Sequence, residues 1–553
     1  MYIRVTRNTA GQKYHHLVES YRDGKNIRQR VLLSLGKVEE DRLEELVAAI
    51  ARHKDILSTL ELAKNISIDK TYIFGPLLVL ERLFQKTGID KVLAVVAGKH
   101  PKIGFDLHRL VFTMVAARFI KAGSKLKVFE HWQKRLHPEM VSGDIALHQL
   151  YRTLDVLAAH KEEIERGLFW HERDLLSLEV DVVLYDLTTL RFESTRTDLG
   201  NLRQFGYSKE MRSDCTQVVL GLLVDTEGIP LGFEVYPGNT FEGATVCDIV
   251  KKLRQKFKVR RFIFVGDRGL FSRKNLQALK GTNKESNGEF IVGMKLAVFK
   301  DRQGEFYDFK RFRRINDDYS VYQTTHEGDR CIITWSRARA ERDRKAREDI
   351  LNKIRKKLAG KKITAKTFVT NTTYQRYVTG LNNGKDFAIN EKAIAEDAMR
   401  DGYFGVLTNV ADMKAEEIIV NYKTLWIIED AFGELKGNLR ARPVFHWTDQ
   451  RIVGHLTLCF LAYLCEALMT KALRDKKLML ESPAIKNQII KPRPLTVGEA
   501  MRELQEIRVI PVQVRSTTMW VRTDISGNSS KLFSAIGLKP PPKVLKVSKT
   551  SKM

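Results

Sequence analysis

The sequence lacks several motifs that would define an enzyme class. Its five cysteines include no C-x-x-C pair, which argues against a zinc site or a disulfide framework and favours a reducing, cytoplasmic compartment. No G-x-x-x-x-G-K-[ST] motif occurs, so we expect no nucleotide cofactor and no nucleotide-driven motor. The first residues, MYIRVTRNTAGQKYHH, contain no apolar segment of the kind found in a signal peptide.

Long apolar runs are scarce as well. The longest, from Ile452 to Met469, includes His455 and Glu466 and only just reaches the length of a membrane span. We therefore expect a buried helix here and no membrane partner. Hydrophobic residues still make up 43% of the 553 residues, which is enough for substantial cores and for about three or four domains of typical size.

Acidic residues are in deficit. Lys and Arg number 94 against 67 Asp and Glu, which gives a formal net charge of +27 and a pI of about 9.7. A folded protein this basic usually binds a polyanion, and nucleic acid is favoured over an anionic membrane surface.

The residue pattern predicts six regions. An Asp23-Gly24 turn between two strand-like runs indicates a hairpin near the N-terminus, and 317–336 indicate another, followed by a strongly charged helix at 337–362. In order, the predicted regions are a β meander (1–36), a helical DNA-binding region (37–178), the first part of an α/β core (179–298), a β-rich insertion domain (299–402), the second part of the core (403–475) and a C-terminal region whose disordered, basic tail begins at Lys539 (476–553).

Two strands of the predicted core end in aspartate, at Asp186 in VVLYD and Asp267 in IFVGD. Their region reads as three strands, a helix, a strand, a helix and a strand, and functional groups gather where the strands of such sheets end. A single strand-end aspartate more often caps a turn or a following helix. The pair carries more weight because a third acid, Glu429, occurs on a later helix.

The stretch from Tyr422 to Lys436 predicts one helix whose residues Leu425, Trp426 and Phe432 face a core, and Glu429 shares that face. Burying a lone carboxylate is costly unless a cation or hydrogen bonds compensate. Three acids that converge at a sheet edge would suit Mg²⁺ or Mn²⁺, and two such ions can support phosphodiester chemistry.

These residues resemble the RNase-H-like DDE transposases of bacterial insertion sequences. The resemblance is to insertion-sequence family four in particular, with its signature Tyr-x2-Arg-x3-Glu-x6-Lys around the third acid. Tyr422, Glu429 and Lys436 match three of its four positions, whereas Leu425 stands where the signature has arginine. The segments VGDRGLF and GYSKEMRSDCTQVVLGLL are also similar to the family, and the resemblance covers about Val180 to Met469.

The resemblance implies an α/β fold: an RNase-H-like core with a mixed five-stranded sheet and a β-rich insertion domain, preceded by the small β meander and the helical region. It implies that Asp186, Asp267 and Glu429 are catalytic and hold two Mg²⁺ or Mn²⁺ ions. Residues implied or conjectured to contact DNA are Tyr422, Lys436, Arg268, and Arg440 or Arg442 in place of the missing arginine.

The resemblance also implies a transposase that cuts at the terminal inverted repeats of its own element and joins the freed 3′-hydroxyl to target DNA. Its partners would be double-stranded DNA and a second copy in a homodimeric synaptic complex, at the nucleoid in the bacterial cytoplasm. Two alternatives stay open: a catalytically inactive DNA-binding descendant, and an RNase-H-like nuclease without strand transfer. Arg268 could equally form a salt bridge, Asp214 is either an active-site neighbour or a turn residue, and His446 is expected to be structural or DNA-facing.

Overall fold

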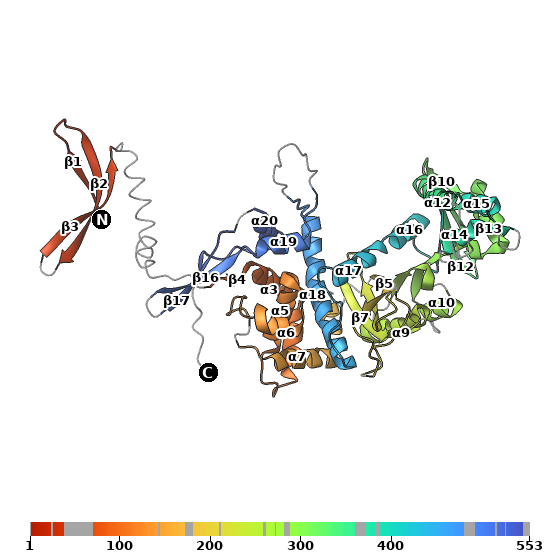
Figure 1. The fold of residues 1–553 in the computed structure, drawn as a ribbon, viewed down its shortest axis with the longest axis horizontal. Coiled ribbons are helices and arrows are strands. Elements are labelled where there is room, and N and C mark those ends of the chain that lie inside the picture. Colours follow the sequence, from red (N-terminus) through yellow and green to blue (C-terminus); the bar gives the residue numbers. More distant parts are fainter. Residues whose placement is uncertain are drawn as a thin grey trace. The chain divides into compact units, whose positions relative to one another are not determined.

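The computed structural model describes residues 2–23, 26–37, 70–141, 144–171, 181–198, 200–208, 212–257, 261–270, 272–280, 288–359, 372–381, 386–480, 493–514, 517–525 and 527–545. The chain forms two compact units (Figure 1). One comprises Met1–Thr71, Ile510–Arg522 and Pro542–Met553, and the other Tyr72–Val509 and Thr523–Pro541.

The first unit contains the predicted β meander. Strands β1 (Tyr2–Arg7), β2 (Lys13–Asp23) and β3 (Asn26–Gly36) pair antiparallel in the order β1-β2-β3. Asp23 lies opposite Asn26 at the hairpin end, while Gly24 lies outside the described residues. In the same unit, β17 (Thr517–Arg522) pairs with β18 (Val544–Leu545). The tail predicted to be disordered from Lys539 therefore contains a short strand, and its last residues, 546–553, lie outside the described residues.

The second unit is built on a mixed sheet of nine strands. Their order is β10-β11-β12-β15-β9-β8-β5-β6-β7, with only β5–β8 and β8–β9 parallel. The strands are β5 (Asp181–Arg191), β6 (Gln217–Val224), β7 (Pro230–Pro237), β8 (Phe262–Gly266), β9 (Glu289–Met294), β10 (Arg313–Asn316), β11 (Tyr319–His326), β12 (Asp329–Ser336) and β15 (Tyr403–Thr408).

The predicted succession of three strands, helix, strand, helix and strand is present, with α9 (Thr245–Phe257) and α10 (Arg273–Lys280) as the helices. The predicted sheet size of five strands is wrong. An exposed edge at β9 would leave a row of backbone donors and acceptors without partners. Strand β15 pairs with that edge, and the strands of the predicted insertion region continue the sheet beyond it.

Strands β6 and β8 are interior strands of this sheet. Every residue of QVVLGLLV and of FIFVG is buried, so these strands are continuous apolar runs without polar alternation. Such runs are typical of strands covered on both faces. Helices α9 and α10 contribute Val246, Ile249 and Leu279 to the same core.

The insertion region contains the predicted hairpin and the predicted charged helix. Strands β11 and β12 are joined by Glu327 and Gly328, both with positive φ, a conformation that glycine adopts without steric cost. Helix α12 (Arg337–Leu358) follows, capped by Ser336, whose side chain accepts a hydrogen bond from the backbone N–H of Arg339. Residues 360–362 of the predicted helix lie outside the described residues.

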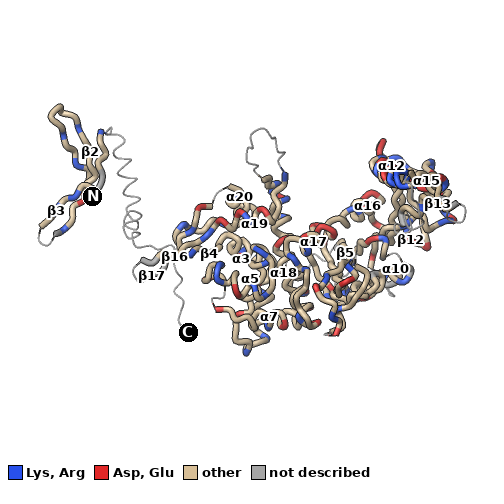
Figure 2. The backbone as a smooth tube through the Cα atoms, viewed as in Figure 1, with Lys and Arg blue, Asp and Glu red and all other residues tan. Residues whose placement is uncertain are grey.

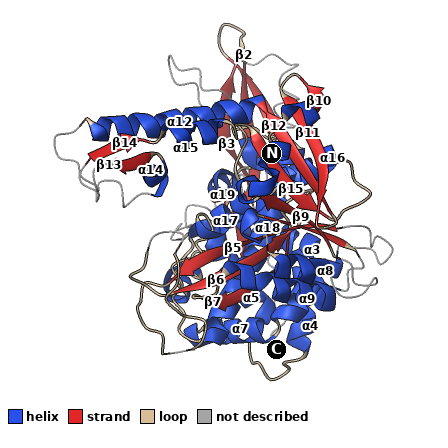
Figure 3. Cartoon of the chain, turned by 90° about the vertical axis from the view of Figure 1, so that its right-hand side faces the viewer, coloured by secondary structure: helices blue, strands red, loops and turns tan. Residues whose placement is uncertain are grey.

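Beyond the hairpin, α12 packs on its own small group of elements, seen in Figure 3. Arg347 of α12 forms two hydrogen bonds with Asp401, at 2.5 and 2.6 Å. The elements are α14 (Thr372–Arg376), β13 (Val378–Leu381), β14 (Asp386–Ile389) and α15 (Glu391–Ala398).

Helix α18 (Asp449–Asp475) is the predicted buried helix. By length and composition it could cross a membrane. However, 89% of its most apolar stretch of 18 residues is buried inside the protein, as expected of a core helix. It packs against α5, α7 and β7. The helices of the preceding region are α3 (Gly75–Thr87), α4 (Ile89–Gly98), α5 (Leu107–Lys121), α6 (Lys125–Lys127), α7 (Leu147–Ala159) and α8 (Lys161–His171). Residues 43–57 of the predicted helical region lie outside the described residues.

After α18, residues near the C-terminus return to the helical region. Strand β16 (Arg508–Val514) pairs through Arg508 and Val509 with β4 (Tyr72–Ile73). Two further helices, α19 (Val497–Leu504) and α20 (Gly527–Ala535), pack against each other.

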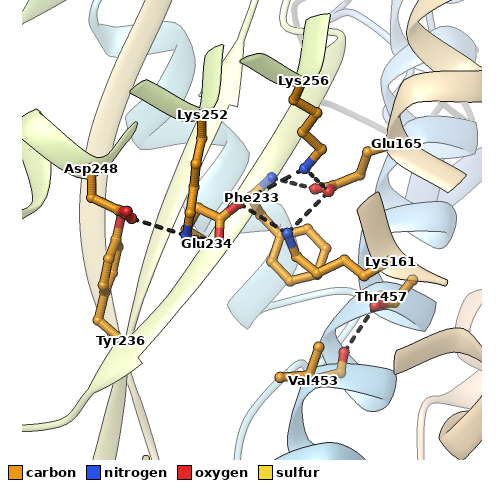
Figure 4. Close-up of polar contacts among 10 residues, drawn as sticks. All are labelled: Lys161, Glu165, Phe233, Glu234, Tyr236, Asp248, Lys252, Lys256, Val453 and Thr457. Carbon is orange, nitrogen blue, oxygen red and sulfur yellow. Dashed lines mark hydrogen bonds and ion pairs between the residues drawn. The ribbon is translucent and has the colours of Figure 1, made fainter. Parts of the chain in front are cut away.

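A buried ion network joins α8 to the sheet (Figure 4). Lys161 Nζ donates to Glu165 at 3.0 Å and to Glu234 at 3.1 Å, and Lys256 also binds Glu165. Burial alone would lower the pKa of Lys161, but the two carboxylates outweigh burial and raise it. Because buried charges are tolerated only when they are paired, this network holds α8 in one position on the sheet.

Candidate active site

The three predicted acids line one cavity of about 410 Å³ in the larger unit. Its lining residues are Asp186, Asp267, Arg268, Tyr319, Thr334, Ser336, Arg339, Arg342, Gly402, Phe404, Tyr422, Lys423, Leu425, Ile428 and Glu429. They come from the sheet, from α12 and from two helices, α16 (Ala415–Lys423) and α17 (Trp426–Lys436).

The two aspartates are brought together by strand register. Strand β5 is parallel to β8, and Leu184 lies opposite Val265. Asp186 and Asp267 each follow that pair by two residues, so the parallel register brings both toward the same end of the two strands, where both line the cavity. Asp186 does not end its strand as predicted, because β5 continues beside β6 as far as Arg191. Only the pairing of β5 with β8 ends near Asp186, at Leu184.

The aspartates differ in their surroundings. Asp186 is half-buried, and its Oδ1 accepts a hydrogen bond of 2.7 Å from the backbone N–H of Leu187. Asp267 is exposed, and its Oδ1 accepts a hydrogen bond of 3.3 Å from Tyr422 Oη. Burial, followed by the charge of Asp267, raises the pKa of Tyr422, so the phenol stays protonated and can donate a hydrogen bond to the carboxylate.

A glycine on β9 makes room for this contact. A Cβ built on Gly293 would collide with Tyr422 Oη and lie 2.8 Å from Arg268 Cγ. The Tyr422 ring packs against Phe404, with ring centroids 4.9 Å apart. The position of the phenol beside Asp267 therefore depends on the missing side chain at Gly293.

The prediction of a single helix around Glu429 is wrong. The segment forms two helices, α16 and α17, with Thr424 and Leu425 in turns between them. Tyr422 and Glu429 therefore lie on different helices. The buried residues of α17 are Ile428, Ala431, Phe432 and Leu435.

With Ile428 set at zero, Glu429 lies about 100° and Lys436 about 80° around the helix. Both therefore flank the buried face and do not lie within it. Trp426 lies about 160° from Ile428 on the same scale, and it is 61% exposed, contrary to the prediction that it faces the core. Phe432 is buried as predicted.

Four basic residues line the cavity beside the acids, and three of them were not singled out from the sequence. Arg339 and Arg342 come from α12 and Lys423 from α16, while Arg268 follows β8. Burial, followed by Arg339 and Arg342, lowers the pKa of Lys423. Figure 2 shows how densely α12 carries Lys and Arg. The charged helix was evident in the sequence, but only the fold shows which of its arginines face the acids.

The other predicted site residues are distributed differently. Leu425 is half-buried and lines the acid cavity. Lys436 and Arg440 do not line it. Arg440 is exposed, and His446 is buried at a separate cavity. Asp214 is exposed and forms a double hydrogen bond with Arg212, at 2.7 and 2.9 Å, outside the acid cavity.

The carboxylates supply the oxygen ligands that Mg²⁺ and Mn²⁺ prefer. Among the residues that the structure describes, however, no three His, Cys, Asp or Glu side chains are close enough together to hold a metal ion. The acids therefore share a cavity without forming a closed ligand set.

Comparison with known proteins adds two family matches. Residues 178–465 match the transposase DDE domain, and residues 3–61 match the N-terminal domain of the IS1634 family transposases. No curated protein matches the chain. A piggyBac transposase synaptic complex with hairpin DNA, solved by cryo-EM, aligns with 78% of this chain and 79% of that chain at 10% identity and a TM-score of 0.36, too low to show a shared fold.

The DDE domain match spans 465 − 178 + 1 = 288 of 553 residues, more than half of the chain, and includes all three acids of the cavity. The predicted placement in insertion-sequence family four is tested by neither match and stays a prediction. The chain belongs to the DDE transposase domain family and carries an N-terminal domain of the IS1634 family type.

Proposed function

We propose that this protein binds the terminal inverted repeats of its own insertion sequence, cleaves the DNA there and joins the freed 3′-hydroxyl to target DNA. The observation that carries the proposal is the cavity that Asp186, Asp267 and Glu429 share inside the matched DDE domain. The parallel register of β5 and β8 brings the two aspartates toward the same end of the strand pair, and Glu429 of α17 lines the same cavity.

We further propose that these three carboxylates hold Mg²⁺ or Mn²⁺, with two ions per active site. Bound there, such ions lower the pKa of an attacking water and stabilise the leaving oxygen of a phosphodiester. Tyr422 orients Asp267 through its hydrogen bond. Because the described residues form no closed ligand set, binding would require Glu429 to approach the two aspartates.

The basic side of the cavity suits the DNA backbone. Arg268, Arg339, Arg342 and Lys423 line the cavity that also holds the acids. Guanidinium and ammonium groups bind phosphate oxygens and fix the register of DNA without reading its sequence. Leu425 occupies the place of the signature arginine, and we propose that the charge absent there is supplied by Lys423 and by the two arginines of α12. We also propose that Lys436 and Arg440, which lie outside this cavity, contact the DNA.

The wider assignment is also a proposal. The strand order β9-β8-β5-β6-β7, with its central parallel pairs, supports an RNase-H-like core. The signature positions Tyr422, Glu429 and Lys436 support insertion-sequence family four. Joining two DNA ends in one event calls for at least two copies of the chain, and we expect them at the nucleoid in the bacterial cytoplasm.

The test replaces each acid by its amide: Asp186→Asn, Asp267→Asn and Glu429→Gln. Each change removes one charge with little change of shape. We expect the cleavage rate to fall at least about 100-fold, which is the usual effect of losing one electrostatic contact to the transition state. Binding of the DNA end should stay nearly intact. Asp214→Asn is the matched control, because this exposed aspartate lies outside the cavity. A gel-shift and a cleavage assay on the same DNA measure both quantities.

Near-normal cleavage by all three amide variants would contradict the assignment. A pre-cleaved end distinguishes the alternatives, because only a transposase joins it to a second duplex, whereas a nuclease leaves it unjoined. A wild-type protein that binds DNA ends but neither cleaves nor joins them would be a catalytically inactive descendant.

A further inference from the structure

A second cavity of the larger unit is lined by several basic side chains. Its volume is about 520 Å³, within the range of about 300 to 1,000 Å³ usual for ligand sites. Arg118, Lys125, Arg440, Arg442, His446 and His455 line it, and none of the described lining residues is Asp or Glu. These residues come from α5, from the start of α6, from the segment after α17 and from α18.

Arg118 is the most constrained of these groups. It is 4% exposed and donates through Nη1 to the carbonyl of Leu439 at 2.5 Å. His455 Nε2 lies 3.2 Å from the carbonyl of Ala441 and donates to it, so His455 Nδ1 accepts from Arg118 Nη2, also at 3.2 Å. Arg118 Nε is buried and has no hydrogen-bond partner among the described residues. One donor of this fixed guanidinium is therefore unsatisfied.

Lys125 is the second buried cation. It is 3% exposed, and its side chain makes no hydrogen bond or ion pair with any residue that the structure describes. Burial, followed by the charge of Arg118, lowers the pKa of Lys125 to about 7. Burial, followed by Lys125 and Arg118, lowers that of His446 to about 3. The basic groups around the cavity thus lower one another's pKa and disfavour one another's charged forms.

Proteins rarely bury two cations together without an anion, because each loses its hydration and repels the other. The ion network of α8 shows how the same chain satisfies buried lysines elsewhere: Lys161 and Lys256 both contact Glu165. None of the described residues that line the second cavity is such an acid. An anion with several oxygens would satisfy the free donor of Arg118 and the ammonium of Lys125 together.

We propose that this cavity is a binding site for a phosphate group, held by Arg118 and Lys125. The group is either a backbone phosphate of DNA or free inorganic phosphate, which present the same oxygens. The surface at the cavity favours DNA: Arg440 is exposed there, and Phe445 is 60% exposed. Base and sugar rings pack on such aromatic side chains, and arginine binds the neighbouring phosphates. The site is separate from the acids and does not depend on catalysis.

The test uses the full-length chain with Lys125→Met, which removes the buried charge and keeps an unbranched side chain. Lys134→Met is the matched control, because Lys134 is exposed and does not line the cavity. Melting temperatures are measured in sodium phosphate and in sodium chloride at equal pH and ionic strength. We expect phosphate to raise the melting temperature of the wild type and of Lys134→Met by several degrees, and we expect Lys125→Met to lose that rise.

A duplex of arbitrary sequence distinguishes the two sources of the phosphate group. If the group belongs to DNA, Lys125→Met lowers the slope of log affinity against log salt by about 0.9 more than Lys134→Met does, since one phosphate contact is lost. An unchanged slope combined with a lost response to phosphate identifies a site for the free anion. Lys125→Met that behaves like Lys134→Met in both measurements overturns the proposal. If Lys125→Met does not fold, Lys125→Gln replaces it in the same comparisons. Neither measurement involves cleavage, so failure here is distinct from failure of the proposed transposition.

Discussion

At the scale of single residues, the acid cavity depends on small positional details. Tyr422 reaches Asp267 only because Gly293 has no side chain, and Leu425 lies at the wall of the cavity where the family signature has arginine. A half-buried leucine next to three carboxylates and several cations is neither a full core residue nor a surface residue. A charged residue at position 425 therefore tests whether the side chain belongs to the cavity wall or to the core.

We expect Leu425→Arg to be tolerated and to tighten binding to DNA. The side chain is half-buried at the open wall, so a guanidinium can extend into the cavity toward a phosphate. Stability should fall by about 1 kcal/mol or less, and the salt slope of DNA binding should rise by about 0.9. Thermal melting and binding titrations measure the two effects. A large drop in melting temperature would instead identify Leu425 as part of the core.

At the scale of elements, α12 links the insertion region to the acid cavity. The helix starts at the Ser336 cap directly after β12, so its first turns pass the cavity and its later turns pack on a core of their own. Arg339 lies over Phe404, with the guanidinium carbon 4.9 Å from the ring centroid. The start of the helix is thus held in place, and its neighbour Arg342 lines the same cavity.

We expect Arg342→Gln to weaken DNA binding more than Arg344→Gln does. Both arginines are exposed on α12, but only Arg342 lines the cavity, so the two variants differ in position and not in charge. Loss of one phosphate contact lowers the salt slope by about 0.9, and the effect should be confined to Arg342→Gln. Filter binding of duplex DNA over a range of salt concentrations measures it. Equal losses from the two variants would show that α12 acts only through its overall charge.

At the scale of the whole molecule, the excess of positive charge should govern DNA affinity. With a net charge of +27, association releases counterions and weakens steeply as salt rises. We expect the C-terminal tail to contribute through Lys546, Lys549 and Lys552, which follow the short strand β18.

We expect a chain truncated after Leu545 to bind nonspecific DNA more weakly and to cleave with unchanged chemistry. The truncation keeps β18 and removes three lysines, so the salt slope should fall by up to about 2.7. Titrations with a nonspecific duplex and single-turnover cleavage at saturating protein separate affinity from chemistry. An unchanged slope would show that the tail does not contact DNA.

Local pattern determined much of this protein. The β meander, the strand and helix order of the core, the hairpin and charged helix of the insertion region and the buried helix α18 follow from short-range periodicity and turn residues. The residue types and spacing of Asp186, Asp267 and Glu429 pointed to the chemistry, because a lone carboxylate on the predicted apolar face of a helix is costly unless a cation or hydrogen bonds compensate.

Tertiary structure decided what depends on contacts between distant segments. The sheet has nine strands because a later segment, β15, covers the edge of β9, and no local pattern encodes that pairing. The helix around Glu429 breaks at Thr424 because packing, and not periodicity, sets where α16 ends and α17 begins. The acids and the arginines of α12 share one cavity, and Arg118 and Arg440 share another, since folding brings together charges that are far apart in the sequence.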